Sequence, residues 1–421
     1  MRMPVKVTHM GLDSHNNFSR VTARDEQGRV AWRGRMEHGD RQKVRQELAQ
    51  WPKVPVVLEG TFGWGWLSDE MRAAGQQPHL ASSRKVAGWR DARGLAKSNK
   101  IDADLLSELW TEKQRWWEVW LAPPEVGDQR EWLRYRMTLV RLQTGIKNRI
   151  HATMHRHGLI HPFSDLFGVK GLMWLGQMSQ EQQSQEQQSL LRESTRATLA
   201  GYLRLLKQLR KQLAEVTREM RRQIRRSAVG ELWRSLPGVS FILAYTILAE
   251  VGEVARFQNG RRLSKYGLLA PMADDSGDED DAAPPGRHVG HLGRVTLQWA
   301  FITAARGASR KSDHFKAIFN RRSDNGTRDR QRAYIAVAHE LCRVGYSCVK
   351  NQRSFIEQRP PRPQPSSCPA RSCAAGNDCV AENGVSPPAE SKPESSRPEV
   401  RRARSPLGRR RGLAPRHRAS L

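Results

Sequence analysis

The chain is 421 residues long, which leaves room for two or three domains. Its 71 lysines and arginines outnumber its 43 aspartates and glutamates, and the net charge of +28 predicts a polyanionic partner, either nucleic acid or a membrane surface. There is no long apolar span and no signal peptide at the Met1 end, and the odd number of five cysteines argues against a disulfide framework. We therefore expect a cytoplasmic protein that does not enter a membrane.

The first part of the chain alternates between β and α patterns. Hydrophobic periodicity predicts three strands linked by hairpins, over residues 5–12, 17–24 and 29–36. Next we expect a helix over 40–51, a strand over 54–58 and a helix over 64–74. A strand over 78–82 and further helix to about 112 follow. This order predicts a ribonuclease-H-like α/β layer, which we assign to residues 1–120.

Acidic side chains stand where these elements would end. Asp13 follows the first strand and Glu59 the fourth. Asp102 shares a face of the next helix with Asn99, three residues before it, whereas Asp104 points elsewhere. Gathered carboxylates repel one another unless metal neutralises them, and divalent ions so held promote phosphoryl transfer. The candidate ligands for Mg²⁺ or Mn²⁺ are thus Asp13, Glu59 and Asp102, with Asn99 as a weaker ligand. Alternatively, Asp13 is a turn residue at the end of a strand, Glu59 caps the next helix and Asp102 is a surface charge.

Residues 121–229 are basic and helical. The pattern over 129–157 predicts an amphipathic helix with a cationic side, on which Lys147 and Arg149 are candidate nucleic-acid contacts. The helix expected over 190–226 carries an apolar stripe, which predicts either coiled-coil pairing of protomers or packing within one chain. Four tryptophans could stack on bases or belong to a core, and we favour the core: Trp110, Trp116, Trp117 and Trp120.

Residues 230–352 are predicted to form a mainly helical domain. A Pro-Gly turn at Gly238, just before an apolar helix, can offer backbone N–H groups to a phosphate. Ser276 stands in an acidic, turn-rich stretch, and its hydroxyl would need a base or a metal to become a nucleophile. Arg287 and Arg294 are candidate phosphate contacts, with surface charge as the alternative. Beyond residue 352, many prolines and serines predict a disordered tail with a basic end over 353–421.

Three blocks of the first domain resemble a known family. They are Gly11-Leu12-Asp13, Leu58-Glu59-Gly60-Thr61 and Lys97-Ser98-Asn99-Lys100-Ile101-Asp102-Ala103. They are similar to the RuvC-like, DEDD-type insertion-sequence transposases, a family shared with the Piv-type DNA invertases. The resemblance continues from Leu236-Pro237-Gly238-Val239-Ser240 to Ser276-Gly277 and covers roughly residues 5–350. It implies a helix–hairpin–helix element at Gly238 and makes Ser276 the nucleophile that becomes covalently joined to DNA.

The chain departs from the family pattern at three positions. Ser98 and Asn99 stand where the family has Thr and Asp, and Gln298 stands where it usually has Arg. The carbonyl oxygen of an asparagine can be a metal ligand, but it brings no negative charge and binds a divalent ion more weakly. These departures leave both metal affinity and activity open.

The resemblance implies a DNA transposase of an insertion sequence that cuts and rejoins DNA strands through an acid–metal centre and a serine. It further implies a homo-oligomer, a dimer or a tetramer, and a structured guide RNA. Two alternatives stay open. One is a metal-dependent, structure-specific DNA nuclease that uses the acidic site alone; the other is an inactive nucleic-acid-binding copy, which Asn99 and Gln298 would explain.

Overall fold

The computed structural model describes residues 6–357 apart from 62, 97, 114, 116, 181–190, 273–287, 290–292, 325, 327 and 328. The chain divides into two units, Met1–Gln358 and Arg359–Leu421. The tail expected over 353–421 therefore lies, from residue 358 onward, outside the described residues. None of the described helices combines the length and the apolar character needed to span a bilayer.

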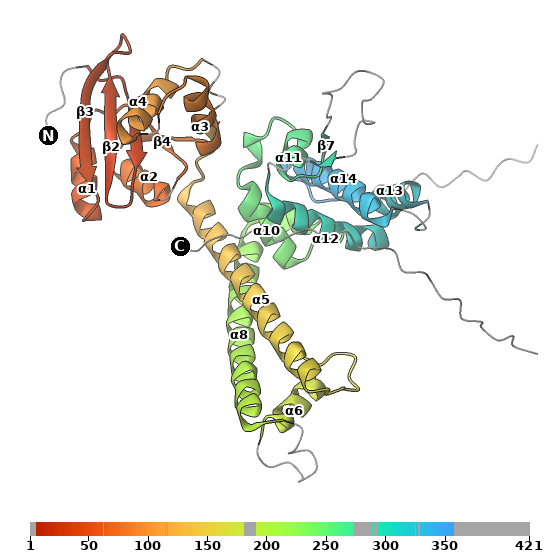
Figure 1. The fold of residues 1–421 in the computed structure, drawn as a ribbon. Coiled ribbons are helices and arrows are strands. Elements are labelled where there is room, and N and C mark those ends of the chain that lie inside the picture. Colours follow the sequence, from red (N-terminus) through yellow and green to blue (C-terminus); the bar gives the residue numbers. More distant parts are fainter. Residues whose placement is uncertain are drawn as a thin grey trace, which may run out of the picture. The chain divides into compact units, whose positions relative to one another are not determined.

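A six-stranded mixed sheet forms the N-terminal part, in the order β3-β2-β1-β4-β5-β6 (Figure 1). The strands are β1 (His9–Ser14), β2 (Phe18–Arg24), β3 (Val30–Glu37), β4 (Pro55–Glu59), β5 (Gln77–Ala81) and β6 (Glu118–Val119). The first three are antiparallel neighbours, whereas β4 runs parallel to both β1 and β5. The predicted mixed α/β class is thus confirmed, while its ribonuclease-H-like assignment stays a prediction.

Helices cover both faces of this sheet. Val56 and Leu58 of β4 pack with α1 (Arg41–Ala49) and α2 (Trp64–Ala73). Val57, which points the opposite way, packs with α3 (Ser83–Ala92) and α4 (Asn99–Leu109). Trp117 is fully buried in this second layer, so the core interpretation is confirmed for that tryptophan.

The helix expected to run to about 112 is in fact two helices. α3 ends at Ala92, and α4 begins at Asn99. Ser98 takes the N-cap position of α4, where its hydroxyl accepts a hydrogen bond from the Ile101 N–H at 3.2 Å. This cap satisfies a backbone donor that the first helical turn leaves unpaired, and so α4 begins at this point.

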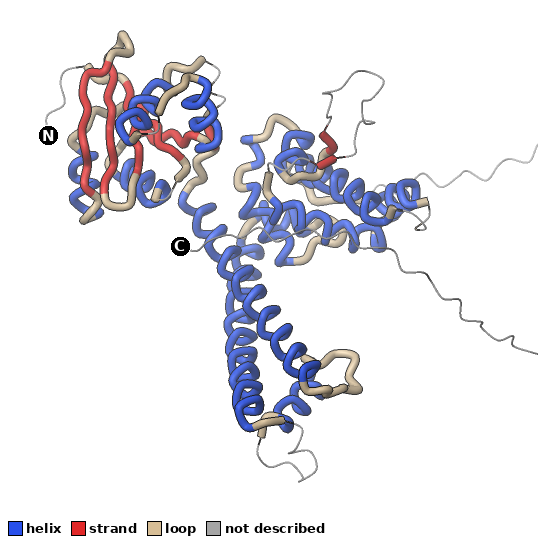
Figure 2. The backbone as a smooth tube through the Cα atoms, in the orientation of Figure 1, coloured by secondary structure: helices blue, strands red, loops and turns tan. Residues whose placement is uncertain are grey.

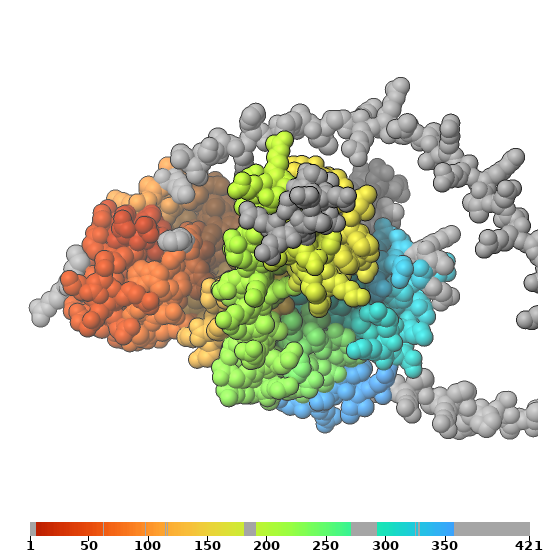
Figure 3. Space-filling view, turned by 90° about the horizontal axis from the view of Figure 1, so that it is seen from below, coloured from red at the N-terminus to blue at the C-terminus, as the bar shows by residue number. Residues whose placement is uncertain are grey.

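Two long helices, α5 (Pro124–Arg156) and α8 (Glu193–Arg226), pack along each other (Figure 2). Leu199 and Leu206 of α8 are buried in a cluster with Ile150 of α5 and Leu175 of α6 (Val169–Met178). In the space-filling view the surfaces of these helices, yellow to green, touch one another (Figure 3). Part of the apolar stripe of α8 is therefore used within the chain, and pairing between protomers stays a prediction.

The C-terminal part is a helical bundle that carries a short hairpin. Its helices are α9 (Ala228–Arg234), α10 (Phe241–Val251), the 3-10 turn η1 (Val254–Arg256), α11 (Gly260–Tyr266), α12 (Val295–Lys311), α13 (Asp313–Ser323) and α14 (Arg330–Lys350). β7 (Pro271–Met272) pairs with β8 (His288–Val289). Trp233, Tyr245 and Phe301 are fully buried in the core of the bundle. The mainly helical character expected over 230–352 is thus observed in the described residues of this range.

Candidate functional site

Strands β1 and β4 place Asp13 beside Glu59. The strands are parallel with Leu12 opposite Leu58, so the two acids occupy the next positions along neighbouring strands. Because successive strand residues alternate between faces, both acids point away from the layer that contains Leu12 and Leu58 and towards the layer of α3 and α4. Asp13 is buried and Glu59 is half-buried.

Helix α4 packs directly on β1 at Gly11. A Cβ atom at this glycine would lie only 2.1 Å from the backbone nitrogen of Ser107 and 2.5 Å from the carbonyl oxygen of Ala103. The absence of a side chain lets the helix approach the strand closely. Asp102, which is buried in the first turn of α4, is thereby held against the same face of the sheet as Asp13.

We expect Gly11→Ala to destabilise the protein by about 1–3 kcal/mol, because the added methyl group overlaps backbone atoms of α4. Thermal unfolding should show a Tm lowered by several degrees. Gly88→Ala is the matched control: this exposed glycine of α3 has no atom within 4 Å of an added Cβ, so its Tm should stay the same or rise. Equal Tm values for the two variants would contradict the close contact of β1 with α4.

The charges of Asp13 and Asp102 act on Glu59. Burial raises the pKa of Glu59 above its ordinary value, and the negative charges of Asp13 and Asp102 raise it further. A hydrogen bond with Ser83 and the positive charge of Arg90 oppose this rise in the pKa. The structure thus brings the three predicted carboxylates into one electrostatic cluster, whose mutual repulsion a bound cation would relieve.

An arginine and a histidine lie beside two of these acids. Arg90 Nη1 lies 3.1 Å from Asp102 Oδ1, and His15 Nε2 lies 3.0 Å from Asp13 Oδ2. The spacing of two residues between Asp13 and His15 near the end of a strand could have indicated the second pair from sequence. No sequence spacing indicated the first pair, because Arg90 reaches Asp102 from a different helix.

The carboxylate oxygens suit Mg²⁺ or Mn²⁺ chemically, since hard divalent ions prefer oxygen ligands. Across the described ranges, however, no group of three or more His, Cys, Asp or Glu side chains is spaced to hold a metal ion. A metal bound by Asp13, Glu59 and Asp102 would have to draw these acids inward and compete with Arg90 for Asp102. Asn99, the first residue of α4, is exposed to solvent.

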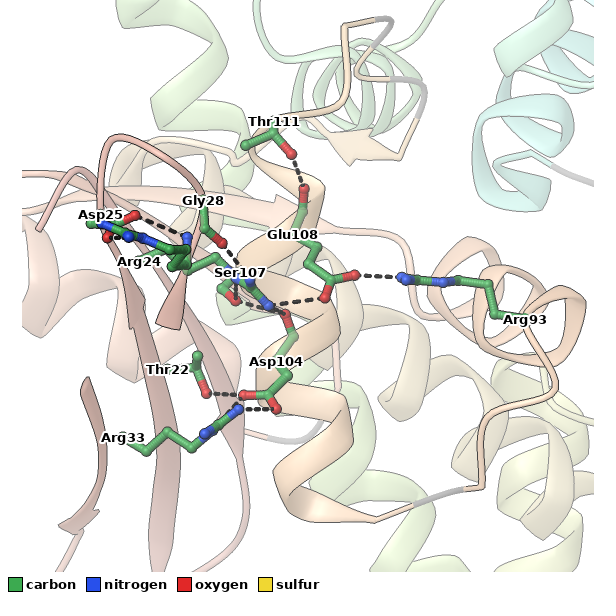
Figure 4. A network of polar contacts seen from close by, with 11 residues as sticks. Thr22, Arg24, Asp25, Gly28, Arg33, Arg93, Asp104, Ser107, Glu108 and Thr111 are labelled. Atoms are coloured by element: carbon green, nitrogen blue, oxygen red, sulfur yellow. Dashed lines mark hydrogen bonds and ion pairs between the residues drawn. The ribbon is translucent and has the colours of Figure 1, made fainter. Parts of the chain in front are cut away.

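Asp104 holds α4 on the sheet instead of joining the acids (Figure 4). It accepts hydrogen bonds from Arg33 Nε at 2.9 Å, Arg33 Nη2 at 2.8 Å and Thr22 Oγ1 at 2.7 Å. Burial alone would raise the pKa of Asp104, but the hydrogen bonds from Arg33 and Thr22 hold it below its ordinary value. The same network continues through Arg24, Ser107, Glu108 and Arg93. The prediction that Asp104 points away from the candidate site is confirmed.

The segment that contains Ser276 joins β7 to β8. In this hairpin Pro271 pairs with Val289 and Met272 with His288. Ser276 and Arg287 belong to residues 273–287, which lie outside the described residues. Their roles as nucleophile and phosphate contact therefore stay predictions.

Arg294 and Gln298 fix the backbone beside this hairpin. The Arg294 N–H donates to the carbonyl oxygen of Tyr266 at 2.9 Å, and its Nε donates to the Tyr266 hydroxyl at 3.0 Å. Gln298 Nε2 donates to the carbonyl oxygen of Leu268 at 2.8 Å. Leu268 has a φ of 54°, in the left-handed region that disfavours side chains. The glutamine that departs from the family pattern thus supports the turn that leads to β7.

The remaining candidate contacts lie apart from the acids in sequence. Lys147 Nζ lies 5.1 Å from the centroid of the Phe167 ring, and Arg149 is exposed on α5. Gly238 has a φ of 80°, and a Cβ there would lie 2.2 Å from the carbonyl oxygen of Ala304 in α12. Close packing against α12 is therefore enough to explain this glycine, and contacts of these residues with nucleic acid stay predictions, as does the helix–hairpin–helix element.

Comparison with known proteins points to one family. Residues 230–320 match the family model described as "Transposase IS116/IS110/IS902 family". The chain is also 27% identical over 130 residues to the "Transposase for insertion sequence element IS1111A" of Coxiella burnetii (strain RSA 493 / Nine Mile phase I). That match covers 29% of this chain and 33% of the relative, so the chain spans about a third of the curated relative's length. The predicted similarity to insertion-sequence transposases is confirmed at this level.

Proposed function

We propose that the protein is a DNA transposase of an insertion sequence, which cuts and rejoins DNA strands. The observation that carries this proposal is the match of residues 230–320 to a transposase family, in a range that includes Ser276 and the hairpin strands that flank its segment. The net charge of +28 supports a polyanionic partner such as DNA. The similarity of the first domain to the acidic blocks of the same family supports a second chemical centre in the chain.

In this proposal Asp13, Glu59 and Asp102 would hold Mg²⁺ or Mn²⁺, with Asn99 as a weaker fourth ligand. Such an ion, when bound, supplies positive charge to the phosphate that reacts. The protein's own part is to keep the three acids on one face of the sheet, through the contact of Gly11 with α4. Glu59 would have to be ionised to act as a ligand, and its raised pKa opposes that ionisation.

Ser276 would carry out the covalent step. Its hydroxyl gives up its proton to a base while its oxygen forms a bond to phosphorus, and the bond from phosphorus to the departing strand oxygen breaks. The departing oxygen takes up a proton. Rejoining is the reverse exchange, in which the hydroxyl of another strand displaces the serine oxygen. A water molecule in place of the serine would give simple hydrolysis, which is the nuclease alternative.

A trapped adduct tests this proposal. The full-length protein would be incubated with Mg²⁺ and a plasmid that carries its gene and flanking DNA, then denatured, digested and examined by mass spectrometry. We expect a peptide from residues 273–287 with a nucleotide attached to Ser276. DNA cutting without an adduct would overturn the proposal in favour of a nuclease. Binding without any cutting would overturn it in favour of an inactive copy.

Asn99→Asp is expected to raise the affinity for Mg²⁺ on the order of tenfold, because it adds a negative charge beside the three acids. Isothermal titration calorimetry with MgCl₂ measures the change. Asn148→Asp, at an exposed position of α5, adds the same charge away from the acids and should leave the affinity unchanged. If no variant and no wild-type protein binds Mg²⁺ or Mn²⁺, the acidic cluster is not a metal site.

A dimer or tetramer and a structured guide RNA belong to the same proposal. Light scattering of the purified protein would measure the oligomeric state. Sequencing of RNA that copurifies with the protein should recover transcripts from the DNA beside its gene. Recovery of unrelated RNA in proportion to its abundance would contradict a guide and would indicate only the binding expected of a basic protein.

A further inference from the structure

Three arginines from separate parts of the chain gather around Tyr266 and Trp120. Arg294 Nε donates to the Tyr266 hydroxyl, and the guanidinium of Arg256 lies 4.6 Å from the centroid of the Tyr266 ring. The guanidinium groups of Arg256 and Arg130 lie 4.4 and 5.4 Å from the ring centroid of Trp120. A cavity is lined in part by these five side chains. We call Arg130, Arg256 and Arg294 the arginine cluster.

Positive charge exceeds negative charge in the arginine cluster. Burial lowers the pKa of Arg130, and the charges of Arg294 and Arg256 lower it further. A guanidinium group remains protonated despite such a shift, so the three charges persist and repel one another. The carboxylates of Glu250 and Glu253 offset part of this charge. The cavity is also lined by Lys85 and Glu118, so four cations face three anions, and this excess of positive charge favours the binding of a further anion.

The hydrogen-bonding capacity of the cluster is also incompletely used. Arg130 donates from Nε to the carbonyl oxygen of Ala249 at 2.9 Å and from Nη2 to that of Glu250 at 3.3 Å, so it caps the end of α10. Arg256 Nε donates to the carbonyl oxygen of Val251 at 2.9 Å. Its buried Nη2 makes no hydrogen bond of standard geometry among the residues that the structure describes, although the Arg256 side chain also interacts with Tyr266. A buried charged donor without an acceptor is costly, and an anionic ligand would remove that cost.

The cluster adjoins the hairpin that flanks the Ser276 segment. The N–H and the Nε of Arg294 both bond to Tyr266, and Tyr266 ends α11 shortly before β7. Arg294 itself follows β8 by a few residues. The two chain segments that lead into and out of the hairpin are therefore joined at the cluster, and a ligand bound there would lie close to the base of the hairpin.

We propose that Arg256 and Arg294, supported by Arg130, bind one backbone phosphate of the DNA strand on which Ser276 acts. This inference rests on the proposed function. The planar guanidinium fork offers paired donors to two phosphate oxygens, a geometry that the ammonium of lysine lacks. A contact of this kind would hold the strand in position and would read no base sequence.

Arg294→Gln is the principal test, since the Arg294 side chain is 43% exposed and its loss leaves the α10 cap in place. Binding of a short duplex from the DNA beside the gene would be measured over a range of salt concentrations. We expect affinity to fall by about 10- to 100-fold and the slope of log K against log salt to flatten by about 0.9. Arg322→Gln removes the same charge from an exposed position of α13 and should change neither quantity by as much.

A second measurement locates the contact on the DNA. Neutral methylphosphonates would replace single phosphates in the duplex. Wild-type protein should lose affinity sharply at one position, and Arg294→Gln should show no further loss there. Arg256→Lys, which keeps the charge but lacks the fork, should show an intermediate loss at that same position. Circular dichroism and thermal unfolding of each variant would confirm that the protein is folded.

The inference is overturned if Arg294→Gln and Arg322→Gln have the same salt slope, or if the methylphosphonate penalty persists in Arg294→Gln. It is also overturned if Arg294→Gln flattens the salt slope for an RNA duplex of the same sequence but leaves the salt slope for the DNA duplex unchanged. If one of these outcomes is found and the wild-type protein still forms a Ser276–DNA adduct, the proposed function stands without this phosphate site. Failure of the wild-type protein to bind or cut DNA would instead remove the proposed function itself.

Discussion

Ser276→Ala is expected to abolish the covalent protein–DNA adduct and to lower strand exchange by about 10⁴-fold or more. The reason is that the reaction loses the oxygen that bonds to phosphorus, and removal of a covalent nucleophile has effects of this size. Denaturing electrophoresis of end-labelled DNA would measure the adduct, and junction-specific amplification would measure strand exchange. Mg²⁺ binding should be unchanged, because Ser276 is not among the proposed ligands.

Ser194→Ala provides the matched control, since Ser194 is an exposed serine of α8 outside the segment that matches the transposase family. It should keep wild-type levels of both adduct and exchange. An adduct that survives in Ser276→Ala would show that another residue is the nucleophile. Strand cutting that is indifferent to the substitution would support the nuclease alternative, with water as the attacking group.

Glu59→Gln is expected to lower metal-dependent strand cutting by about 10²-fold or more, because the site loses a charged ligand. The same substitution should raise the free energy of unfolding at neutral pH. The pKa of Glu59 is raised in the folded protein by burial and by Asp13 and Asp102, so the folded state binds this proton more tightly than the unfolded state does. Ionised Glu59 therefore costs stability at neutral pH, and a neutral glutamine removes that cost.

The pH range of this effect follows from the direction of the shift. The stability that the protonated form of Glu59 contributes is fully present below the ordinary pKa of 4.5. It is lost as the pH rises from there through the raised pKa of the folded state. Thermal unfolding should thus show that the Tm of Glu59→Gln increases relative to the Tm of the wild type as the pH rises towards 7. A Tm well below that of the wild type at pH 7 would contradict this account of the acidic cluster.

Asp69→Asn is the control for Glu59→Gln. The Asp69 carboxylate is 52% exposed on α2, and its nearest cationic partner, Arg72, lies 3.7 Å away. Its loss should change neither cutting nor the pH dependence of stability, since exposed ion pairs contribute little. Removal of divalent ions with EDTA should abolish cutting by the wild-type protein. Cutting that persists in EDTA would leave the acidic residues without their proposed role.

Local patterns in the sequence determined most of the elements and the order of the sheet domain. Alternation and helical spacing depend only on near neighbours along the chain, so they predicted the hairpin strands, the buried strand before Glu59 and the helix that carries Asp102. The separate phase of Asp104 was also predictable, because the turn angle of a helix fixes which face each residue occupies. Charge alone indicated a polyanionic partner.

The tertiary structure decided the features that join distant residues. It pairs Arg90 with Asp102, gives Gln298 a role at Leu268, and assembles the arginine cluster from three separate parts of the chain. It also places part of the apolar stripe of α8 against α5 and α6, where the sequence left pairing between protomers equally open. Periodicity shows that the apolar face of a helix must be covered, but it does not show which segment or protomer covers it. That choice depends on the free energy of packing between segments far apart in the chain.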